Sequence, residues 1–514
     1  MTLRKIPEGK VISRIKLENS WWENGQIDKF YADLRPRAYF ERFQGLVKEV
    51  QTAAVRRAPI LMGPRRVGKT VMLLHLTQAL IKAGTDPRRI CYVSVEHPIF
   101  NGLGLDDLVH LAREAAGAAA TDISGCTFMF DEIQYLKDWE RHLKTLVDTY
   151  PRATWIASGS AAAALRLKSN ESGAGRFTDF LLPPLTFHEY VVLLGKDELL
   201  LGQDELLLGQ DELLRTGRTW VETADLTALN ELFVDYLNFG GYPEVALSPA
   251  IRADPGRYVR QDIIDKVLLR DLPSLYGISD IQELNSLFTA FAYNTANEVS
   301  LDKLAQRAGI AKNTVKRYLE YLEAAFLVKR VHRIDHNARK FQRATLFKVY
   351  LTNPSLRAAL FSPISADDPD MGAMVETAVF SQWFHFASGN LHYARWKDGE
   401  VDLVLVDGTG DPRWACEVKW SDRFGAQSPE FRNLIMFCKT HNLHEAIVTT
   451  RSERSDETVD GVVIKCIPAS LSCYTIGHNI VQGRPSKAPI GPRLPATARG
   501  SLAAGHRARR DPLR

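Results

Sequence analysis

The sequence predicts an α/β protein with a parallel-sheet domain in its N-terminal half, a helical region after it, and a second α/β domain near the C-terminus. Two observations lead to this prediction. Apolar runs within residues 60–62, 91–97, 126–134 and 152–162 alternate with helical patterns, as in a parallel sheet covered by helices. Residues 390–407 instead alternate apolar and polar side chains, which is typical of a β-hairpin.

The composition limits the function classes. The chain has 514 residues, of which 45% are hydrophobic and 25% charged, so it fits a globular protein of three or four domains. A net charge of +4 is too small to indicate nucleic acid by itself. The six cysteines have no paired spacing of the zinc or disulfide kind. The N-terminus lacks an apolar signal core, and no apolar run reaches the roughly 18 residues that span a bilayer, so we expect a cytoplasmic protein without membrane contact.

The strongest motif follows the first apolar run. The stretch "GPRRVGKT" has the spacing Gly63-x-x-x-x-Gly68-Lys69-Thr70 and precedes a helical pattern, which is the context of a phosphate-binding loop, or P-loop. Backbone N–H groups of such a loop surround phosphates at a helix N-terminus. Lys69 is predicted to reach the β- and γ-phosphates of ATP, and Thr70 to hold Mg²⁺. The predicted nucleotide-binding loop comprises Gly63, Pro64, Arg65, Arg66, Val67, Gly68, Lys69, Thr70 and Val71.

Two further apolar runs end in polar residues. "CTFMFDEIQ" places Asp131 and Glu132 at the carboxyl end of a buried strand, where they can face a nucleotide. Asp131 is predicted to support Mg²⁺, and Glu132 to polarise the attacking water. "RATWIASGSAA" places Ser158 and Ser160 where a hydroxyl can sense the γ-phosphate, and the sequence does not decide between them.

The pieces "GPRRVGKT", "FMFDEIQ", "IASGSAA", "GAGRFTDFLLPPLTFHEY" and "GGYPEV" occur in that order. Together they resemble the AAA+ ATPase family of bacteria and archaea that carries a nuclease-like C-terminal domain of unknown function, over about Trp21 to Ile467. The resemblance implies an ATPase. It also implies that Arg176 contacts phosphate, in its own or a neighbouring subunit. The alternative is an ion pair with a local acid such as Asp179.

The predicted domains follow from these motifs and the resemblance. They are an N-terminal extension (1–50), the AAA+ core (51–185), a helical lid (186–284), a winged helix (285–335), a restriction-endonuclease-like domain (336–475) and a basic tail (476–514). Within the lid, residues 197–214 contain a tandem seven-residue repeat with leucines at heptad spacing. This repeat is either a surface extension or a short oligomerisation helix in a homo-oligomer.

Residues 297–331 have a helix-turn-helix pattern. Ser300 can cap a first helix, and Gly309 marks the turn before a second. The second helix is predicted to expose Lys312, Asn313, Lys316 and Arg317. This winged helix either binds DNA or packs as a module beside the ATPase domain.

The stretch "EVDLVLVDGTGDPRWACEVKW" holds a second candidate site. Glu417 and Lys419 are two apart on a strand, so both point to one face, and Asp402 on the neighbouring strand can reach it. Two carboxylates can hold Mg²⁺, and a lysine can orient or deprotonate water. The pattern resembles the restriction-endonuclease-like superfamily, although Val401 replaces the proline often found before the Asp. The resemblance implies that Glu376, on the preceding helix, supports the metal.

The sequence therefore predicts an enzyme that hydrolyses ATP to drive or gate a nuclease-like domain acting on DNA. Residues 483–514, rich in Arg and Pro, are predicted to be disordered and to hold nucleic acid nonspecifically. The alternative is a nucleotide-switched regulator whose C-terminal domain binds a partner and has lost nuclease activity.

Overall fold

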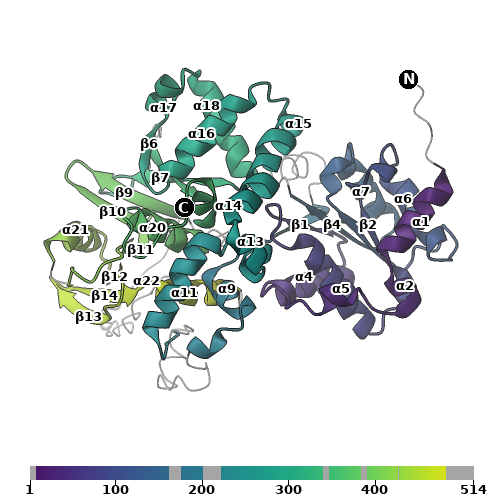
Figure 1. The fold of residues 1–514 in the computed structure, drawn as a ribbon, viewed down its shortest axis with the longest axis horizontal. Coiled ribbons are helices and arrows are strands. Elements are labelled where there is room, and N and C mark those ends of the chain that lie inside the picture. The colour runs from purple at the N-terminus through teal and green to yellow at the C-terminus, as the bar shows by residue number, and fades with distance from the viewer. Residues whose placement is uncertain are drawn as a thin grey trace, which may run out of the picture.

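The computed structural model describes residues 7–160, 175–200, 221–339, 346–383, 390–425 and 428–481. Figure 1 shows two parts side by side: an α/β domain built from the N-terminal residues, and a larger part that contains every labelled element from α9 onward. Among the described residues, no helix is long and apolar enough to cross a membrane. Residues 482–514 of the predicted basic tail and nearly all of the heptad repeat lie outside the described residues, whereas residues 476–481 form the end of a helix, α22 (Ala469–Val481).

The first domain contains a five-stranded sheet in the order β2-β3-β4-β1-β5, and all its neighbouring strands are parallel. The strands are β1 (Ala58–Met62), β2 (Ile90–Ser94), β3 (Thr127–Asp131), β4 (Thr154–Gly159) and β5 (Phe177–Leu181). Strands β1 and β3 are buried along their full length, as parallel strands covered on both faces must be. The predicted parallel α/β sheet is thus confirmed.

Helices cover this sheet (Figure 1). They are α4 (Phe40–Thr52), α5 (Lys69–Lys82), α6 (Leu105–Ala115) and α7 (Trp139–Thr149), with the short turns η1 (Pro87–Arg89), η2 (Pro98–Phe100) and η3 (Ile133–Tyr135). The chain before them forms α1 (Glu8–Glu18), α2 (Trp21–Asn24) and α3 (Lys29–Ala32).

The N-terminal extension covers the edge of the sheet at β2. The amide of Asn19 exchanges two hydrogen bonds with the backbone of Tyr92, of 2.7 and 2.8 Å, as a neighbouring strand would. The indole groups of Trp21 and Trp22 both donate to the carbonyl of Ile90, at 3.0 and 2.8 Å. These bonds satisfy a strand edge that would otherwise be open to another chain.

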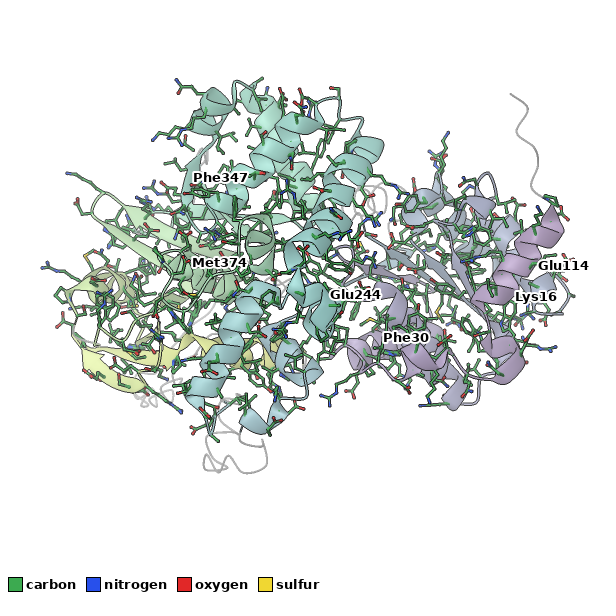
Figure 2. All side chains as sticks on the ribbon, in the orientation of Figure 1. Lys16, Phe30, Glu114, Glu244, Phe347 and Met374 are labelled. Atoms are coloured by element: carbon green, nitrogen blue, oxygen red, sulfur yellow. The ribbon has the colours of Figure 1, made fainter. Side chains whose placement is uncertain are left out.

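The larger part begins with helices that connect it to the first domain. They are α9 (Phe187–Leu193), η4 (Asp197–Leu199), α11 (Leu226–Phe239), α12 (Pro243–Leu247), α13 (Pro249–Ala253), α14 (Pro255–Tyr258), the π-helical turns η5 (Val259–Asp265) and η6 (Val267–Asp271), α15 (Leu272–Tyr276) and α16 (Ile281–Tyr293). In Figure 2, Glu244 of α12 lies between the two parts of the molecule.

A second sheet of nine strands has the order β13-β14-β12-β11-β10-β9-β7-β8-β6. One part of this sheet flanks a pair of helices in the sequence. Strand β6 (Glu298–Ser300) precedes α17 (Leu301–Ala308) and α18 (Lys312–Ala324), and β7 (Val328–Ile334) and β8 (Leu346–Leu351) follow them. Ser300 caps α17, and Gly309 ends it with φ of 67°, as the sequence predicts. Strand β7 pairs in parallel with β9, so these strands and the C-terminal strands share one sheet.

The C-terminal segment completes this sheet. Its elements are α19 (Ser355–Leu360), α20 (Met371–Trp383), β9 (Asn390–Trp396), β10 (Gly399–Val406), β11 (Pro412–Glu417), η7 (Pro429–Phe431), α21 (Arg432–Thr440), β12 (Glu445–Thr450), β13 (Ser455–Val459), β14 (Val462–Pro468) and α22 (Ala469–Val481). Strands β9, β10 and β11 are antiparallel, and β12 runs parallel to β11. The hairpin predicted over residues 390–407 is formed by β9 and β10.

Candidate functional site

The P-loop connects β1 to α5 in the predicted order. Gly63 is in close contact with the chain after β5, because a Cβ there would lie 2.0 Å from the carbonyl oxygen of Leu182. Gly68 has φ of 95° immediately before α5, which begins at Lys69. Both glycines are therefore required by the backbone: the first by close approach and the second by its left-handed conformation.

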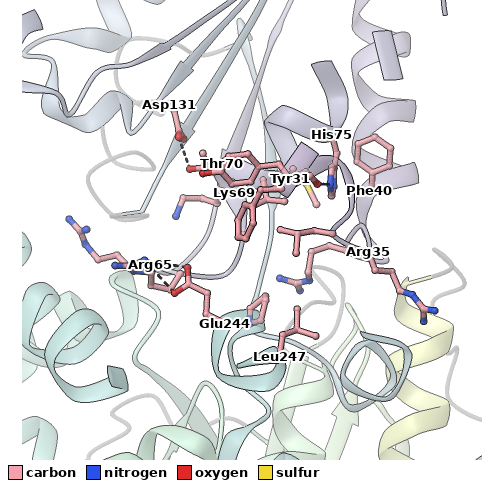
Figure 3. Close-up of a pocket in the computed structure, with 18 of the residues that line it drawn as sticks. Tyr31, Arg35, Phe40, Arg65, Lys69, Thr70, His75, Asp131, Glu244 and Leu247 are labelled. Carbon is pink, nitrogen blue, oxygen red and sulfur yellow. Dashed lines mark hydrogen bonds and ion pairs between the residues drawn. The ribbon is translucent and has the colours of Figure 1, made fainter. Parts of the chain in front are cut away.

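The predicted catalytic residues converge beside this loop. The side chain of Lys69 is 4% exposed. Its ammonium donates to the carbonyls of Gly63 and Pro64 at 3.3 and 3.0 Å, and lies 3.6 Å from a carboxylate oxygen of Glu132. The hydroxyl of Thr70 donates to Asp131 at 2.6 Å (Figure 3). The hydroxyl and carboxylate oxygens that Mg²⁺ prefers are thus adjacent, so these two residues fit the ion predicted to accompany ATP.

Two serines organise the acidic pair. Ser158 donates to Asp131 and also accepts from the backbone N–H of Glu132, while Ser160 donates to the Glu132 carboxylate. The side-chain amide of Gln134 adds a 2.6 Å hydrogen bond to Glu132. The serines predicted as γ-phosphate sensors therefore form hydrogen bonds with the two carboxylates. Their role as sensors stays a prediction.

The pKa values of the acidic pair shift in opposite directions. Burial disfavours the charged form of Glu132, but the Lys69 ammonium and the hydrogen bond from Ser160 more than offset it and lower its pKa. Burial and the neighbouring Glu132 raise the pKa of Asp131. Glu132 is consequently the carboxylate held ionised, as a group that polarises water must be.

A cavity of about 840 Å³ extends from this site. Lys69, Thr70, Asp131 and Glu132 line one end, while its other walls come from the N-terminal extension and from α12 and α13 (Figure 3). Its apolar and aromatic lining includes Phe30, Tyr31, Leu34, Phe40, Leu193, Leu247 and Ile251. These residues were not predicted from the sequence, although the aromatic side chains of "KFYADLRPRAYF", upstream of the P-loop strand, are a usable signal.

Arg37 was also missed and is buried beside the P-loop. Its guanidinium forms two hydrogen bonds with Glu189, of 2.7 and 2.9 Å, and donates to the carbonyls of Val67 and Pro183 at 2.6 and 3.0 Å. One side chain therefore joins the extension, the P-loop and α9. Because it engages the Val67 carbonyl, it helps to fix the orientation of the loop backbone.

The two P-loop arginines face the larger part of the molecule. Arg65 forms two hydrogen bonds with Asp271, of 2.6 and 2.9 Å, and a third with the hydroxyl of Tyr135. Arg66 lies 3.3 Å from Glu244 and 3.6 Å from Asp262. Both arginines also line the cavity, so they lie between the nucleotide end of the cavity and the acids of α12, η5 and η6.

Arg176 lies elsewhere. It is half-exposed, it pairs with Asp148 at 2.5 Å, and it is not among the described residues that line the cavity. The structure thus shows an ion pair with a local acid, as in the alternative given above, and contact of Arg176 with phosphate in a neighbouring subunit stays a prediction. Of the other predicted loop residues, Val71 lines the cavity and Val67 is buried behind it.

The C-terminal candidate residues come together at the nine-stranded sheet. Glu376 of α20, Asp402 of β10 and Glu417 at the end of β11 interact electrostatically, and Lys419 donates to Glu417 at 2.7 Å. Burial, reinforced by Asp402, raises the pKa of Glu417 to about 8. Burial raises the pKa of Glu376 to about 7, in spite of a 2.9 Å ion pair with Lys348.

Lys348, which the sequence analysis missed, occupies the centre of this cluster. Its ammonium lies 2.9 Å from Glu376, 2.9 Å from Glu400 and 3.5 Å from Asp402. The oxygen donors suit a hard divalent ion, but no group of three or more His, Cys, Asp or Glu side chains within the described ranges is arranged to hold one. With Lys348 in this place the residues do not fit a metal, so metal binding by Glu376, Asp402 and Glu417 stays a prediction.

The predicted polar face of α18 is exposed. Lys312, Asn313, Lys316 and Arg317 all lie on the surface, and Lys312 forms a 2.6 Å ion pair with Asp302 of α17. The face therefore offers three basic side chains, one of them already paired within the helix-turn-helix segment.

Three family models match separate parts of the chain. Residues 55–191 match an AAA domain, residues 230–368 a domain of unknown function (DUF8612), and residues 371–471 a domain of unknown function (DUF4143). The AAA match covers the parallel sheet, the P-loop and the acidic pair. Residues 55–191 are accordingly an ATP-binding domain of the AAA ATPase class.

Curated relatives are similar over most of their length. An uncharacterised protein of Methanocaldococcus jannaschii, MJ1544, is 22% identical over 78% of this chain and 84% of its own. An uncharacterised protein of Mycobacterium tuberculosis, Rv2008c, is 26% identical over 71% of each chain.

The similarity to solved structures is more distant. The Aeropyrum pernix ORC2 protein is 16% identical with a TM-score of 0.36, over 65% of this chain and 96% of its own. The Thermotoga maritima RuvB branch migration motor is 15% identical with a TM-score of 0.28, over 57% of this chain and 88% of its own.

Proposed function

We propose that this protein hydrolyses ATP and that the nucleotide state of its AAA domain gates the C-terminal domain, which acts on DNA. The observation that carries the proposal is the convergence of Lys69, Thr70, Asp131 and Glu132 at one end of a cavity whose other walls include α12 and α13. Nucleotide bound there touches both parts of the molecule.

Each residue of the ATP site has a distinct task. Lys69 supplies positive charge to the β- and γ-phosphates, and Thr70 and Asp131 hold the Mg²⁺ that neutralises phosphate charge when ATP is bound. Glu132, held ionised beside Lys69, orients the attacking water and accepts its proton. The aromatic and apolar residues at the other end of the cavity, among them Tyr31 and Phe40, suit the flat base of the nucleotide.

The P-loop arginines are the residues through which nucleotide binding is proposed to act on the larger part of the molecule. Arg65 and Arg66 carry positive charge beside the phosphate site, and acids of η6, η5 and α12 already hold them. ATP brings negative charge that competes with these acids for the same guanidinium groups. Binding and hydrolysis of ATP thus alter the contacts of Asp271, Glu244 and Asp262.

DNA is proposed as the substrate on two grounds. The arrangement of Glu376 on α20, Asp402 on β10, and Glu417 and Lys419 at and just after the end of β11 supports the restriction-endonuclease-like assignment. Helices α17 and α18 with β6, β7 and β8 support a winged helix with a basic face. A homo-oligomer in which Arg176 reaches a neighbour's nucleotide belongs to the same proposal, since Arg176 is half-exposed and does not line the cavity of its own chain.

A second candidate function is a nucleotide-switched protein whose C-terminal domain binds a partner without cleaving DNA. The contacts of Lys348 favour it, because this ammonium already neutralises part of the carboxylate cluster.

Labelled DNA distinguishes the two candidates. We expect parent protein to cleave labelled DNA with Mg²⁺ or Mn²⁺ and ATP, and Asp402→Ala and Lys69→Ala to cleave less. Without nuclease activity, ATP-dependent DNA binding that falls steeply with salt would support the second candidate with DNA as the partner. Absence of both would refute the role of DNA.

A further inference from the structure

Lys348 joins two regions of the chain that match different families. It lies in β8, within residues 230–368, which match one family model. The carboxylates of Glu376, Glu400 and Asp402 belong to residues 371–471, which match another. The side chain of Lys348 is 4% exposed and approaches all three carboxylates. The neighbouring Tyr350 of β8 donates a 2.6 Å hydrogen bond to Glu376, so β8 holds this acid at two points.

The remaining oxygens of the cluster are largely engaged as well. The second carboxylate oxygen of Asp402 accepts the backbone N–H of Val418 at 2.9 Å, and Glu417 is paired with Lys419. On the outer side, Arg395 lies 3.4 Å from Glu400 and 3.6 Å from Glu298. The one cation that contacts both Glu376 and Asp402, among the described residues, is Lys348.

An ammonium and a divalent ion would compete for this carboxylate cluster. Each binds to several carboxylate oxygens, and two cations a few ångströms apart in a buried site repel each other strongly. From this geometry we infer that Lys348 is the resident cation of the cluster, and that a divalent ion binds Glu376 and Asp402 only when the ammonium of Lys348 is withdrawn. The inference rests on the proposed assignment of this cluster as a nuclease-like site.

Strands β8 and β10 belong to one continuous sheet, so the exchange of cations involves the side chain of Lys348 rather than a movement of β8. The ligand class is a hard divalent cation such as Mg²⁺ or Mn²⁺.

Calorimetric titration of Mn²⁺ into the nucleotide-free full-length chain tests the inference. We expect Lys348→Gln to bind Mn²⁺ about tenfold more tightly than the parent, or more, because a competing charge is removed. The matched control is Arg395→Gln, which removes a positive charge from the exposed side of Glu400 and is expected to change the affinity by less than about threefold. Adding Asp402→Asn to Lys348→Gln should abolish the binding, which locates it in the cluster.

Equal Mn²⁺ affinity in the parent and in Lys348→Gln, or no binding in Lys348→Gln, overturns the inference. If Lys348→Gln fails to fold without metal, its folding is measured again in the presence of Mn²⁺. Recovery of the fold in Mn²⁺ supports the inference, because the ion then replaces the ammonium. Failure to fold both with and without Mn²⁺ overturns it. In the parent, Lys348 should be shielded from an amine-acylating reagent and become reactive as Mn²⁺ saturates the cluster.

DNA cleavage by the same proteins keeps the two proposals separate. Tighter Mn²⁺ binding by Lys348→Gln without cleavage by any variant removes the nuclease proposal and retains the exchange of cations. Cleavage that requires Asp402, together with equal Mn²⁺ affinity in the parent and in Lys348→Gln, retains the nuclease proposal and removes the exchange of cations.

Discussion

At the scale of single residues, Glu132 is held in an unusual backbone conformation. Its φ of 56° lies in the left-handed region, which costs on the order of 1 kcal/mol for a non-glycine residue. Hydrogen bonds from Ser160 and Gln134 to its carboxylate, and from its own N–H to Ser158, hold it there. The carboxylate therefore points at Lys69 before nucleotide arrives.

We expect Glu132→Gln to bind ATP with little change and to hydrolyse it at least about 100-fold more slowly, because the base is lost while the phosphate and Mg²⁺ contacts remain. Single-turnover hydrolysis and equilibrium binding of a fluorescent ATP analogue measure the two effects. Glu96→Gln is the matched control, since Glu96 lines the same cavity without a proposed role. Hydrolysis by Glu132→Gln at the parent rate would contradict the assignment.

The C-terminal acids predict a pH dependence of stability. The pKa of Glu417 is raised to about 8 by burial and by Asp402, from the ordinary value near 4.5 that the unfolded chain retains. Between these values the folded state binds the proton more tightly, so this carboxyl stabilises the folded state at low pH. That contribution is lost as pH rises from about 4.5 to about 8.

We expect Glu417→Gln, which mimics the protonated carboxyl, to be less sensitive to alkaline pH than the parent. Thermal unfolding in EDTA at pH 5 and pH 8.5 measures this, and Glu430→Gln is a control on an exposed neighbouring acid. A parent and variant that lose stability equally between the two pH values would show that Glu417 is ionised throughout.

At the scale of elements, the turn from β1 into α5 depends on close packing against the chain after β5. A Cβ at position 63 would lie 2.0 Å from the carbonyl of Leu182, which is itself bonded through its N–H to Met62 at 2.7 Å. The methyl group of an alanine at position 63 would therefore collide with backbone atoms rather than with a flexible side chain.

We expect Gly63→Ala to lower the free energy of unfolding by about 1–3 kcal/mol and to abolish tight ATP binding, because the loop must move to relieve the contact. Gly45→Ala in α4 is the control: its Cβ meets nothing within 4 Å, and alanine is the better helix former by about 1 kcal/mol. Urea unfolding and ATP titration distinguish them, and unchanged ATP affinity in Gly63→Ala would contradict the packing argument.

At the scale of the whole molecule, the pair Arg65–Asp271 connects the phosphate site to the larger part. Both side chains are nearly buried, with 13% and 11% exposure, so solvent screens the pair weakly. Phosphate and Asp271 cannot both engage the same face of one guanidinium fully, so the proposed contact of Arg65 with ATP would compete with this ion pair.

We expect Asp271→Asn to bind ATP about threefold to tenfold more tightly, because Arg65 is freed for phosphate, and to weaken the effect of ATP on the larger part. ATP titration and hydrogen exchange over residues 243–276, with and without ATP, measure both. Asp265→Asn removes a charge from the same stretch, at an acid that forms no ion pair with Arg65 or Arg66 within the described ranges, and should change neither quantity. Unchanged exchange differences in Asp271→Asn would rule out this route.

The sequence by itself determined the local parts of the protein. The loop from Gly63 to Thr70 is contiguous, so its spacing specifies its conformation and its place before α5. Asp131 joins Thr70 across 61 positions because strands of a parallel sheet end at one edge. Glu417 and Lys419 meet because side chains two apart share a face of an extended chain, at 2.7 Å.

Only the tertiary structure decided which distant segments meet these sites. Lys348 enters the carboxylate cluster, Arg37 connects the extension to Val67, and Asp271 holds Arg65. Periodicity encodes which face of an element is buried, but it carries no information about which other element covers that face. A lone lysine in an apolar strand, or an arginine in a loop, has no local pattern that names its partner. Such partners are set by the packing of whole elements and appear only when the chain is folded.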